Sequence, residues 1–286
     1  MKLLFAGDWA PVRPQMDLKG DGIAIGNLEC AFADGEVASE KAYSSVLPRS
    51  CMDNIPSGGF AALSVANNHV NDAGNFRETY AELVRRFPAI QFFGTIENPY
   101  AVFESNNHKS NNLKSNNQTI LIYPHWGMEG EYTRYPSPAL LKLAREWIDA
   151  GAEGVFGSHS HVPQGRETYK GRPIYYSLGN FDFDHPEGKR YGGTEDRLEV
   201  LVENGVGVKE IFSSEKARQS VERASAELTG WNTWEWAKKV GPFNLKKNTA
   251  SWHLRLKKNL LKTLPKFIVW QLLPKTILFR IAGLCR

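Results

Sequence analysis

Short apolar runs that stop abruptly at glycine and polar residues recur along the first two thirds of the chain, and they constrain the fold more than any other feature. Runs of this kind, bounded by turn residues, are typical of strands buried on both faces of a sheet. Between them, residues 75–87 and 138–150 repeat apolar side chains at helical spacing. Strands that alternate with helices predict a layered α/β fold. The expected strands lie at 3–6, 23–25, 61–66, 119–123, 154–156 and 173–178.

Carboxylate, amide and imidazole side chains follow these apolar runs, at the points where the strands would end. In α/β folds the carboxyl ends of the strands form the edge at which sites are built. Hard divalent cations take oxygen ligands, and Zn, Mn or Fe also take imidazole. The array therefore predicts a metal site and favours a metal-dependent hydrolase. Its members are Asp8, Glu29, Asn68, His69, Asp72, His125, His159 and His161.

Each motif taken alone also has a purely structural explanation. A Gly-Asp pair such as the one ending at Asp8 is usually part of a turn. The polar residues 67–69 could cap a helix. The spacing of His159 and His161 places both rings on one side of a strand or loop, which any surface strand allows. The convergence of many such groups is what favours the ligand interpretation.

Taken in order, the motifs resemble the CapA-like family of capsule and poly-γ-glutamate synthesis proteins, which is similar to the calcineurin-like metallophosphoesterases. The resemblance covers about residues 3–185 and implies a metallophosphoesterase-like β-sandwich flanked by helices. The motifs that carry it are Gly7-Asp8, Asn27-Leu28-Glu29, Ala66-Asn67-Asn68-His69 with Asp72 and Gly74, His125-Trp126-Gly127, the segment 157–165, and Tyr176-Ser177-Leu178-Gly179-Asn180-Phe181.

The resemblance also implies a ligand set for two divalent metal ions, Mn, Fe or Zn. Asp8 and His161 would bind the first ion, and Glu29 would bridge the two. The second ion would take Asn68, His125 and His159. His69 would stand beside the ions as proton donor to the leaving group, and Asp72 would orient His69.

Two departures from the related enzymes leave two functions open. Those enzymes usually place a histidine two residues after the first aspartate, where this chain has Ala10, and their bridging residue is usually aspartate rather than Glu29. The first hypothesis is a phosphoesterase-type hydrolase acting in capsule or surface-polymer biosynthesis, on polysaccharide or poly-γ-glutamate. The alternative is a non-catalytic assembly or export factor of the polymer-synthesis machinery at the membrane.

An anionic small molecule or polymer is the substrate class that this chemistry suits. Arg134 and Arg166 are candidate substrate-binding residues, because guanidinium matches phosphate or carboxylate with two hydrogen bonds. Asn180 is a further candidate for contact with substrate or for orienting a ligand.

The last part of the chain has a different character. The alternation of strands and helices stops near residue 212, which predicts a first domain at 1–212 and a helical, basic appendage at 213–286. Residues 238–286 hold twelve Lys or Arg and no Asp or Glu, which leaves 23 basic against 31 acidic residues elsewhere. Lysines opposite Trp, Phe and Leu suit a helix lying on an anionic membrane surface, or docking on a membrane synthase.

The alternative for this tail is packing on the main domain or on a second subunit. Its charge would also suit nucleic acid, but no recognised binding motif accompanies it, and no nucleic acid is expected. Three cysteines without metal or redox spacing suit a cytoplasmic protein, which the tail would bring to the inner membrane face. Between the expected strands, residues 105–119 repeat a polar five-residue unit, which predicts a loop.

Overall fold

The computed structural model describes residues 1–14, 17–35, 37, 44–96, 101, 119–127, 132–183, 193–203, 207–228 and 236. The polar repeat, except Thr119, and the basic tail from residue 238 lie outside these residues, so the expectations made for them stay predictions. Among the helices that are described, none combines the length and the apolar character needed to cross a membrane.

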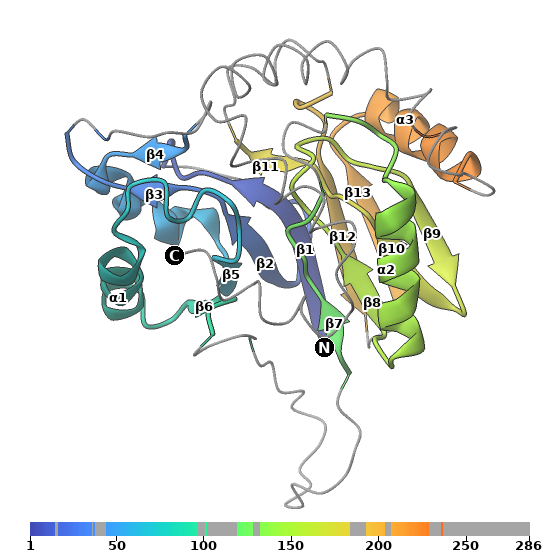
Figure 1. Ribbon diagram of the computed structural model, residues 1–286, viewed down its shortest axis with the longest axis horizontal. Helices are drawn as coiled ribbons and strands as arrows, with labels where there is room; N and C mark the ends of the chain where they lie inside the picture. The colour runs from blue at the N-terminus through green and yellow to red at the C-terminus, as the bar shows by residue number, and fades with distance from the viewer. Residues whose placement is uncertain are drawn as a thin grey trace, which may run out of the picture. The chain divides into compact units, whose positions relative to one another are not determined.

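A mixed seven-stranded sheet combines N-terminal strands with three strands from residues 180–212 (Figure 1). Its strand order is β13-β12-β1-β2-β5-β6, and β11 pairs with the end of β1. Strands β1, β2, β5 and β6 are parallel, whereas β12 runs antiparallel to both β1 and β13. The strands are β1 (Lys2–Trp9), β2 (Ile23–Leu28), β5 (Ala62–Ser64), β6 (Gln91–Phe93), β11 (Asn180–Asp182), β12 (Leu198–Glu203) and β13 (Gly207–Phe212).

A second sheet of four strands has the order β7-β8-β10-β9, with β7, β8 and β10 parallel and β9 antiparallel to β10. A small two-stranded sheet joins β3 to β4. The bounds are β3 (Ala31–Phe32), β4 (Val46–Leu47), β7 (Leu121–Ile122), β8 (Gly154–Phe156), β9 (Arg166–Tyr169) and β10 (Arg172–Tyr175).

The two large sheets pack face to face and are covered by helices on their outer faces. Between the sheets, the ring of Phe5 on β1 stacks on Phe156 of β8 with centroids 4.1 Å apart. The 3₁₀ helix η1 (Arg49–Gly58) and helix α1 (Phe76–Arg86) cover the seven-stranded sheet, and α2 (Pro138–Asp149) covers the four-stranded one. Figure 1 shows α1 and α2 on opposite sides of the sheets. The predicted layered α/β class is therefore confirmed.

Local sequence explains where α2 begins. Ser137 caps α2 by accepting a hydrogen bond from the backbone N–H of Leu140, and Pro138 occupies the first turn, where its missing N–H costs nothing. The predicted helices at 75–87 and 138–150 agree with α1 and α2 to within one residue at each end.

Helix α3 (Glu215–Ala226) follows β13 and packs on β9 and β13, burying Ala217, Val221 and Ala224. Its Ser225 hydroxyl accepts a hydrogen bond from the backbone N–H of Arg166 at 2.9 Å. Contacts thus join α3 to the sheets in one compact unit, Met1–Ala237, which extends past the boundary expected at residue 212.

Candidate metal centre

The predicted ligands lie at the carboxyl ends of parallel strands from both sheets. Asp8 lies near the end of β1 and Glu29 directly follows β2. His125 follows β7, and a bridge from His125 to Ser158 continues the parallel pairing of β7 with β8. His159 comes directly after that bridge. Because the two sheets pack face to face, residues more than a hundred positions apart in the sequence lie close together.

β1 reaches this place by changing its neighbour at Gly7. Residues 2–5 pair with β12, whereas Asp8 and Trp9 pair with β11. A β-carbon at Gly7 would lie 1.8 Å from the carbonyl oxygen of Gly179, so only glycine allows this close approach. The Asp8 N–H donates to the same carbonyl at 3.0 Å, which fixes the carboxylate at the junction of the sheets.

A first group of potential ligand atoms comes from Asp8, Glu29 and His161. One atom from each lies within 4.8 Å of the others. His161 Nε2 is 3.8 Å from Glu29 Oε1. The side chains of all three are buried, so a cation among them would be largely shielded from solvent.

A second group, which shares Glu29 with the first, contains His125 and His159. His125 Nε2 lies 2.9 Å from His159 Nδ1, 3.4 Å from Glu29 Oε1 and 2.7 Å from Asn68 Oδ1. A metal about 2.0–2.1 Å from each of its ligands holds neighbouring ligand atoms about 3.0–3.4 Å apart. The three distances from His125 Nε2 are therefore near those within one coordination shell, and the exposed Asn68 marks its solvent side.

Glu29 is the residue that most clearly lacks a partner. Both of its carboxylate oxygens are buried, and neither has a hydrogen-bond partner among the described residues. Burial, and next the nearby charge of Asp8, raise the pKa of Glu29 well above its ordinary value. A buried carboxylate without hydrogen-bond partners is costly. A cation shared by the two groups would supply the positive charge that compensates Glu29. The donor set therefore fits divalent metal.

The other charges of the site are arranged for metal ligation. Burial opposes ionisation of Asp8, but the nearby imidazoles of His125 and His161 and the amide of Asn27 hold its pKa below the ordinary value. Burial lowers the pKa of His161 to about 4. Burial and then the neighbouring imidazoles lower the pKa of His159 well below its usual range. At neutral pH these two imidazoles are unprotonated, which is the form that binds metal.

The loop after β8 holds its two histidines in an unusual backbone conformation. His159 has φ 104° and His161 has φ 57°, and among the described non-glycine residues only Lys170 also has positive φ. Such conformations cost roughly 1–3 kcal/mol each and persist where the surroundings impose them. The geometry that aims both rings toward Glu29 is thus maintained against local backbone preference.

Asn180, predicted to contact substrate or orient a ligand, orients His161. Its Oδ1 accepts from His161 Nδ1 at 2.9 Å, while its amide nitrogen donates to the carbonyl of Thr194 at 3.1 Å. This leaves Nε2 of His161 for the ligand group. The rings of Phe183 and Tyr132 stack on the imidazole with centroids 4.8 and 5.8 Å away, which restricts its rotation.

His69 and Asp72 form the pair expected from the sequence. His69 Nδ1 lies 2.6 Å from Asp72 Oδ2, and the same oxygen accepts from the backbone N–H of Ser45 at 2.8 Å. On the other side of the ring, His69 Nε2 is 3.9 Å from Glu29 Oε1. The imidazole therefore stands between a fixed carboxylate and the shared ligand.

Two asparagines that were not selected as site residues connect these parts. Asn27 Nδ2 donates to Asp8 Oδ1 at 2.9 Å, and Asn27 Oδ1 accepts from Asn67 Nδ2 at 3.1 Å. Asn67 Oδ1 in turn accepts from the backbone N–H of His69 at 3.0 Å. Their position in the motifs beside Glu29 and Asn68 was the available signal, since a polar residue at a buried strand end needs a partner.

Neither predicted substrate arginine is brought into the two ligand groups. Arg134 pairs with Asp196 and donates to the carbonyl of Pro163 at 3.0 Å. Arg166, at the start of β9, forms a two-pronged ion pair with Glu210 of β13. Each guanidinium instead joins segments of the fold, because a carboxylate within the chain already takes its hydrogen bonds.

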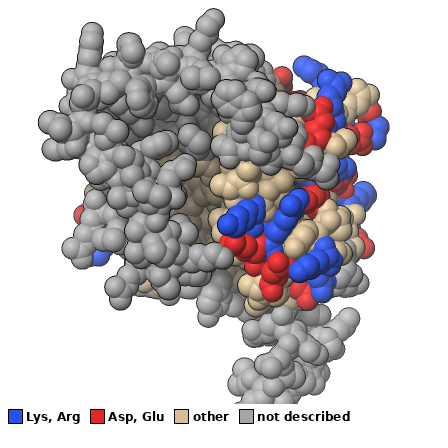
Figure 2. All heavy atoms as spheres, turned by 45° about the vertical axis from the view of Figure 1, so that its right-hand side comes forward, with Lys and Arg blue, Asp and Glu red and all other residues tan. Residues whose placement is uncertain are grey.

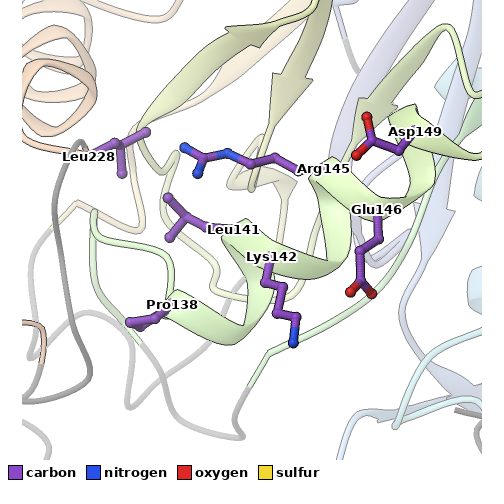
Figure 3. A pocket seen from close by; sticks show the side chains of 7 residues that line it. All are labelled: Pro138, Leu141, Lys142, Arg145, Glu146, Asp149 and Leu228. Carbon is purple, nitrogen blue, oxygen red and sulfur yellow. The ribbon is translucent and has the colours of Figure 1, made fainter.

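A separate pocket of about 410 Å³ lies beside α2 and contains none of the candidate ligands (Figure 3). Its charged side chains are of both signs, and Arg145 is bonded to Glu167 at 2.7 and 2.9 Å. Figure 2 likewise shows basic and acidic side chains interspersed over the coloured part of this face. The lining residues are Pro138, Leu141, Lys142, Arg145, Glu146, Asp149 and Leu228.

Fold and site together define an α/β sandwich with a cluster of His, Asp and Glu at its strand ends. The model of the family described as bacterial capsule synthesis protein PGA_cap matches residues 4–109 and 107–185. The chain belongs to this family, which confirms the resemblance stated from the motifs.

Relatives with assigned names match shorter segments. The capsule biosynthesis protein CapA of Bacillus anthracis is 34% identical over 119 residues, 40% of this chain and 27% of that protein. The PGA biosynthesis protein CapA of Bacillus subtilis (strain 168) is 38% identical over 103 residues, 34% of this chain and 25% of that protein. A probable polyglutamine synthesis accessory protein of Mycobacterium tuberculosis (strain ATCC 25618 / H37Rv) is 30% identical over 118 residues, 39% and 30% of the two chains. The matches thus span 25–30% of these relatives' lengths.

Proposed function

We propose that this protein is a metal-dependent, phosphoesterase-type hydrolase that acts in the synthesis of a capsule or surface polymer. The observation that carries the proposal is the sharing of Glu29 by two groups of ligand atoms, one with Asp8 and His161 and one with His125 and His159. The chain belongs to a capsule synthesis family and has relatives named for capsule and PGA biosynthesis, which supports a role in polymer synthesis. An anionic polymer or small molecule is the substrate class.

In this proposal Asp8, Glu29 and His161 hold one divalent ion of Mn, Fe or Zn, and Glu29, Asn68, His125 and His159 hold the second. Two such ions, when bound, lower the pKa of water and neutralise charge on a phosphoryl group. Asp72 accepts the Nδ1 proton of His69 and so orients the ring. Nε2 of His69 then lies on the side of Glu29, from which it would donate a proton to the leaving oxygen.

Removing the proton donor should separate turnover from metal binding. We expect His69→Ala to lower kcat by about 10²–10⁴-fold, the usual contribution of general acid catalysis. Asp72→Asn should lower it by about 10–100-fold, as the loss of an orienting partner does. Both variants keep the metal ligands, so elemental analysis should find wild-type metal content. Turnover of an alkyl phosphate ester, whose leaving alkoxide needs a proton, by His69→Ala at the wild-type rate would remove this assignment.

A second candidate is a non-catalytic assembly or export factor at the membrane. Ala10 takes the position where related enzymes usually carry a histidine, and it is packed in the hydrophobic core with 4% of its surface exposed. A relative named as an accessory protein points the same way. Genetic complementation separates the candidates. If a His159→Ala/His161→Ala double variant that binds no metal still restores polymer production, the accessory role holds and the hydrolase proposal fails.

The basic segment 238–286 is the proposed contact with an anionic membrane surface or a membrane synthase, at the cytoplasmic face. Each Lys or Arg near an anionic leaflet contributes about 1 kcal/mol, so twelve without an acidic residue bind strongly. Truncation at about residue 240 should move the protein out of the membrane fraction. A truncated chain that stays with the membranes rules out this role for the tail.

A further inference from the structure

His125 must present Nε2 to the second ion if the proposed metal centre is to form. Nε2 is the ring nitrogen that faces Asn68, His159 and Glu29, at 2.7–3.4 Å. A neutral imidazole carries one proton, which must then sit on Nδ1 and needs an acceptor. The surroundings of Nδ1 therefore decide whether this histidine is ready to bind.

Among the described residues, three side-chain atoms lie near Nδ1: one is a donor, and another is more distant than a usual hydrogen bond. Asn27 Nδ2, at 3.1 Å, is a donor. Turning its amide round would break the bond to Asp8 and place two N–H groups of Asn27 and Asn67 against each other. Asp8 Oδ1 is 3.5 Å away, beyond the usual 2.7–3.2 Å of an N–H···O hydrogen bond, and already accepts from Asn27.

The third atom, Ser158 Oγ, lies 3.1 Å from Nδ1. A hydroxyl both accepts and donates, so Ser158 Oγ can accept the Nδ1 proton. The residue is fully buried, and its backbone N–H donates to the carbonyl of Pro124 at 2.9 Å. The backbone of Ser158 thus holds the residue beside His125.

We propose that Ser158 is a positioning residue that selects the metal-binding tautomer of His125. The inference rests on the proposed metal centre and adds a residue to it. In the metal-free protein the same hydroxyl can donate to Nδ1, while Nε2–H donates to Asn68 Oδ1. Ser158 can therefore follow the change of tautomer on loading, which the amide of Asn27 cannot do.

Zinc titration of the metal-free protein by calorimetry tests this directly. Ser158→Ala should weaken binding of the second zinc ion about 10–100-fold and leave the first unchanged. Ser160→Ala is the matched control, because Ser160 lies in the same loop and is also buried, while its hydroxyl donates to the carbonyl of Val162 at 2.7 Å. That variant should bind both ions as the wild type does.

A measurement on the wild type keeps the test independent of how well the variant folds. In the zinc-loaded protein, the Nδ1 proton of His125 should exchange slowly and show a nuclear Overhauser effect to the β-protons of Ser158. Ser158→Ala should speed its exchange. If both ions bind Ser158→Ala as tightly as wild type, or if that proton shows no contact with Ser158, the inference fails. A wild type that binds no zinc overturns the metal centre itself.

Discussion

Glu29→Gln will weaken the binding of both metal ions together, whereas His161→Ala and His159→Ala will each mainly affect one. Glu29 is the residue common to the two ligand groups, so its charge serves both. We expect its replacement to reduce metal affinity by more than the roughly 10–100-fold that follows loss of an outer-shell contact, and turnover to fall with it. Titration with metal and elemental analysis of the three variants provide the measurement.

The same substitution should stabilise the metal-free protein. Burial raises the pKa of Glu29, so the folded state holds a proton that the unfolded state releases above its ordinary pKa of about 4.5. The stability of the metal-free wild type therefore falls as pH rises from that value toward the raised pKa of Glu29. Glutamine has no such dependence, and the gain in the free energy of unfolding should grow with pH.

Glu199→Gln is the matched control for the loss of metal binding. Glu199 is also a fully buried glutamate with a raised pKa, caused first by burial, but it lies on β12 and accepts from the backbone N–H of Lys19 at 2.9 Å. Its replacement should leave metal content unchanged. Equal metal binding by Glu29→Gln and Glu199→Gln would contradict the assignment of Glu29 as the shared ligand.

Gly7→Ala should destabilise the fold much more than Gly207→Ala, although each substitution adds one methyl group. The added β-carbon would stand 1.8 Å from the carbonyl oxygen of Gly179, and the clash is with backbone, so β1 and β11 must separate. Overpacking usually costs about 1–3 kcal/mol, and a clash with backbone belongs at or above the upper end. Chemical denaturation of the metal-free protein measures the loss, and the displacement of Asp8 should also weaken metal binding.

Gly207→Ala provides the comparison within the same sheet. A β-carbon there would meet the Glu203 carbonyl oxygen at 3.5 Å, which is an ordinary contact, and Gly207 is exposed at the start of β13. A change within about 0.5 kcal/mol is expected, as for most surface positions. If Gly7→Ala were equally mild, the close approach of β1 to Gly179 could not be what places Asp8.

The ligands could be found from the sequence because each follows a recognisable apolar run. Six strands were expected from such runs, and a parallel strand fixes where its last side chains go, so Asp8, Glu29 and His125 could be placed at one edge without knowing the topology. The separation into two overlapping groups could not be derived from spacing. The division into two groups depends on how the two sheets pack against each other. Before the structure, only the family resemblance predicted it.

Contacts between distant segments could not be predicted from the sequence, because tertiary packing decides which polar side chains become partners. Arg134 and Arg166 were chosen because guanidinium binds anions, but Asp196 and Glu210, 62 and 44 residues further on, take those bonds in the fold. The orienting role of Ser158 depends on a 3.1 Å contact across the β7–β8 pairing, and no local pattern encodes it. Local periodicity predicts elements, whereas partner choice among polar side chains is decided by tertiary packing.

Metal content of the purified wild-type protein, measured beside a His159→Ala/His161→Ala double variant, tests the central claim most directly. The two histidines belong to different ligand groups and share Glu29 as common neighbour. We expect about two divalent ions per wild-type chain and their loss in the double variant. A wild type without metal, or a double variant that keeps the wild-type content, would contradict it.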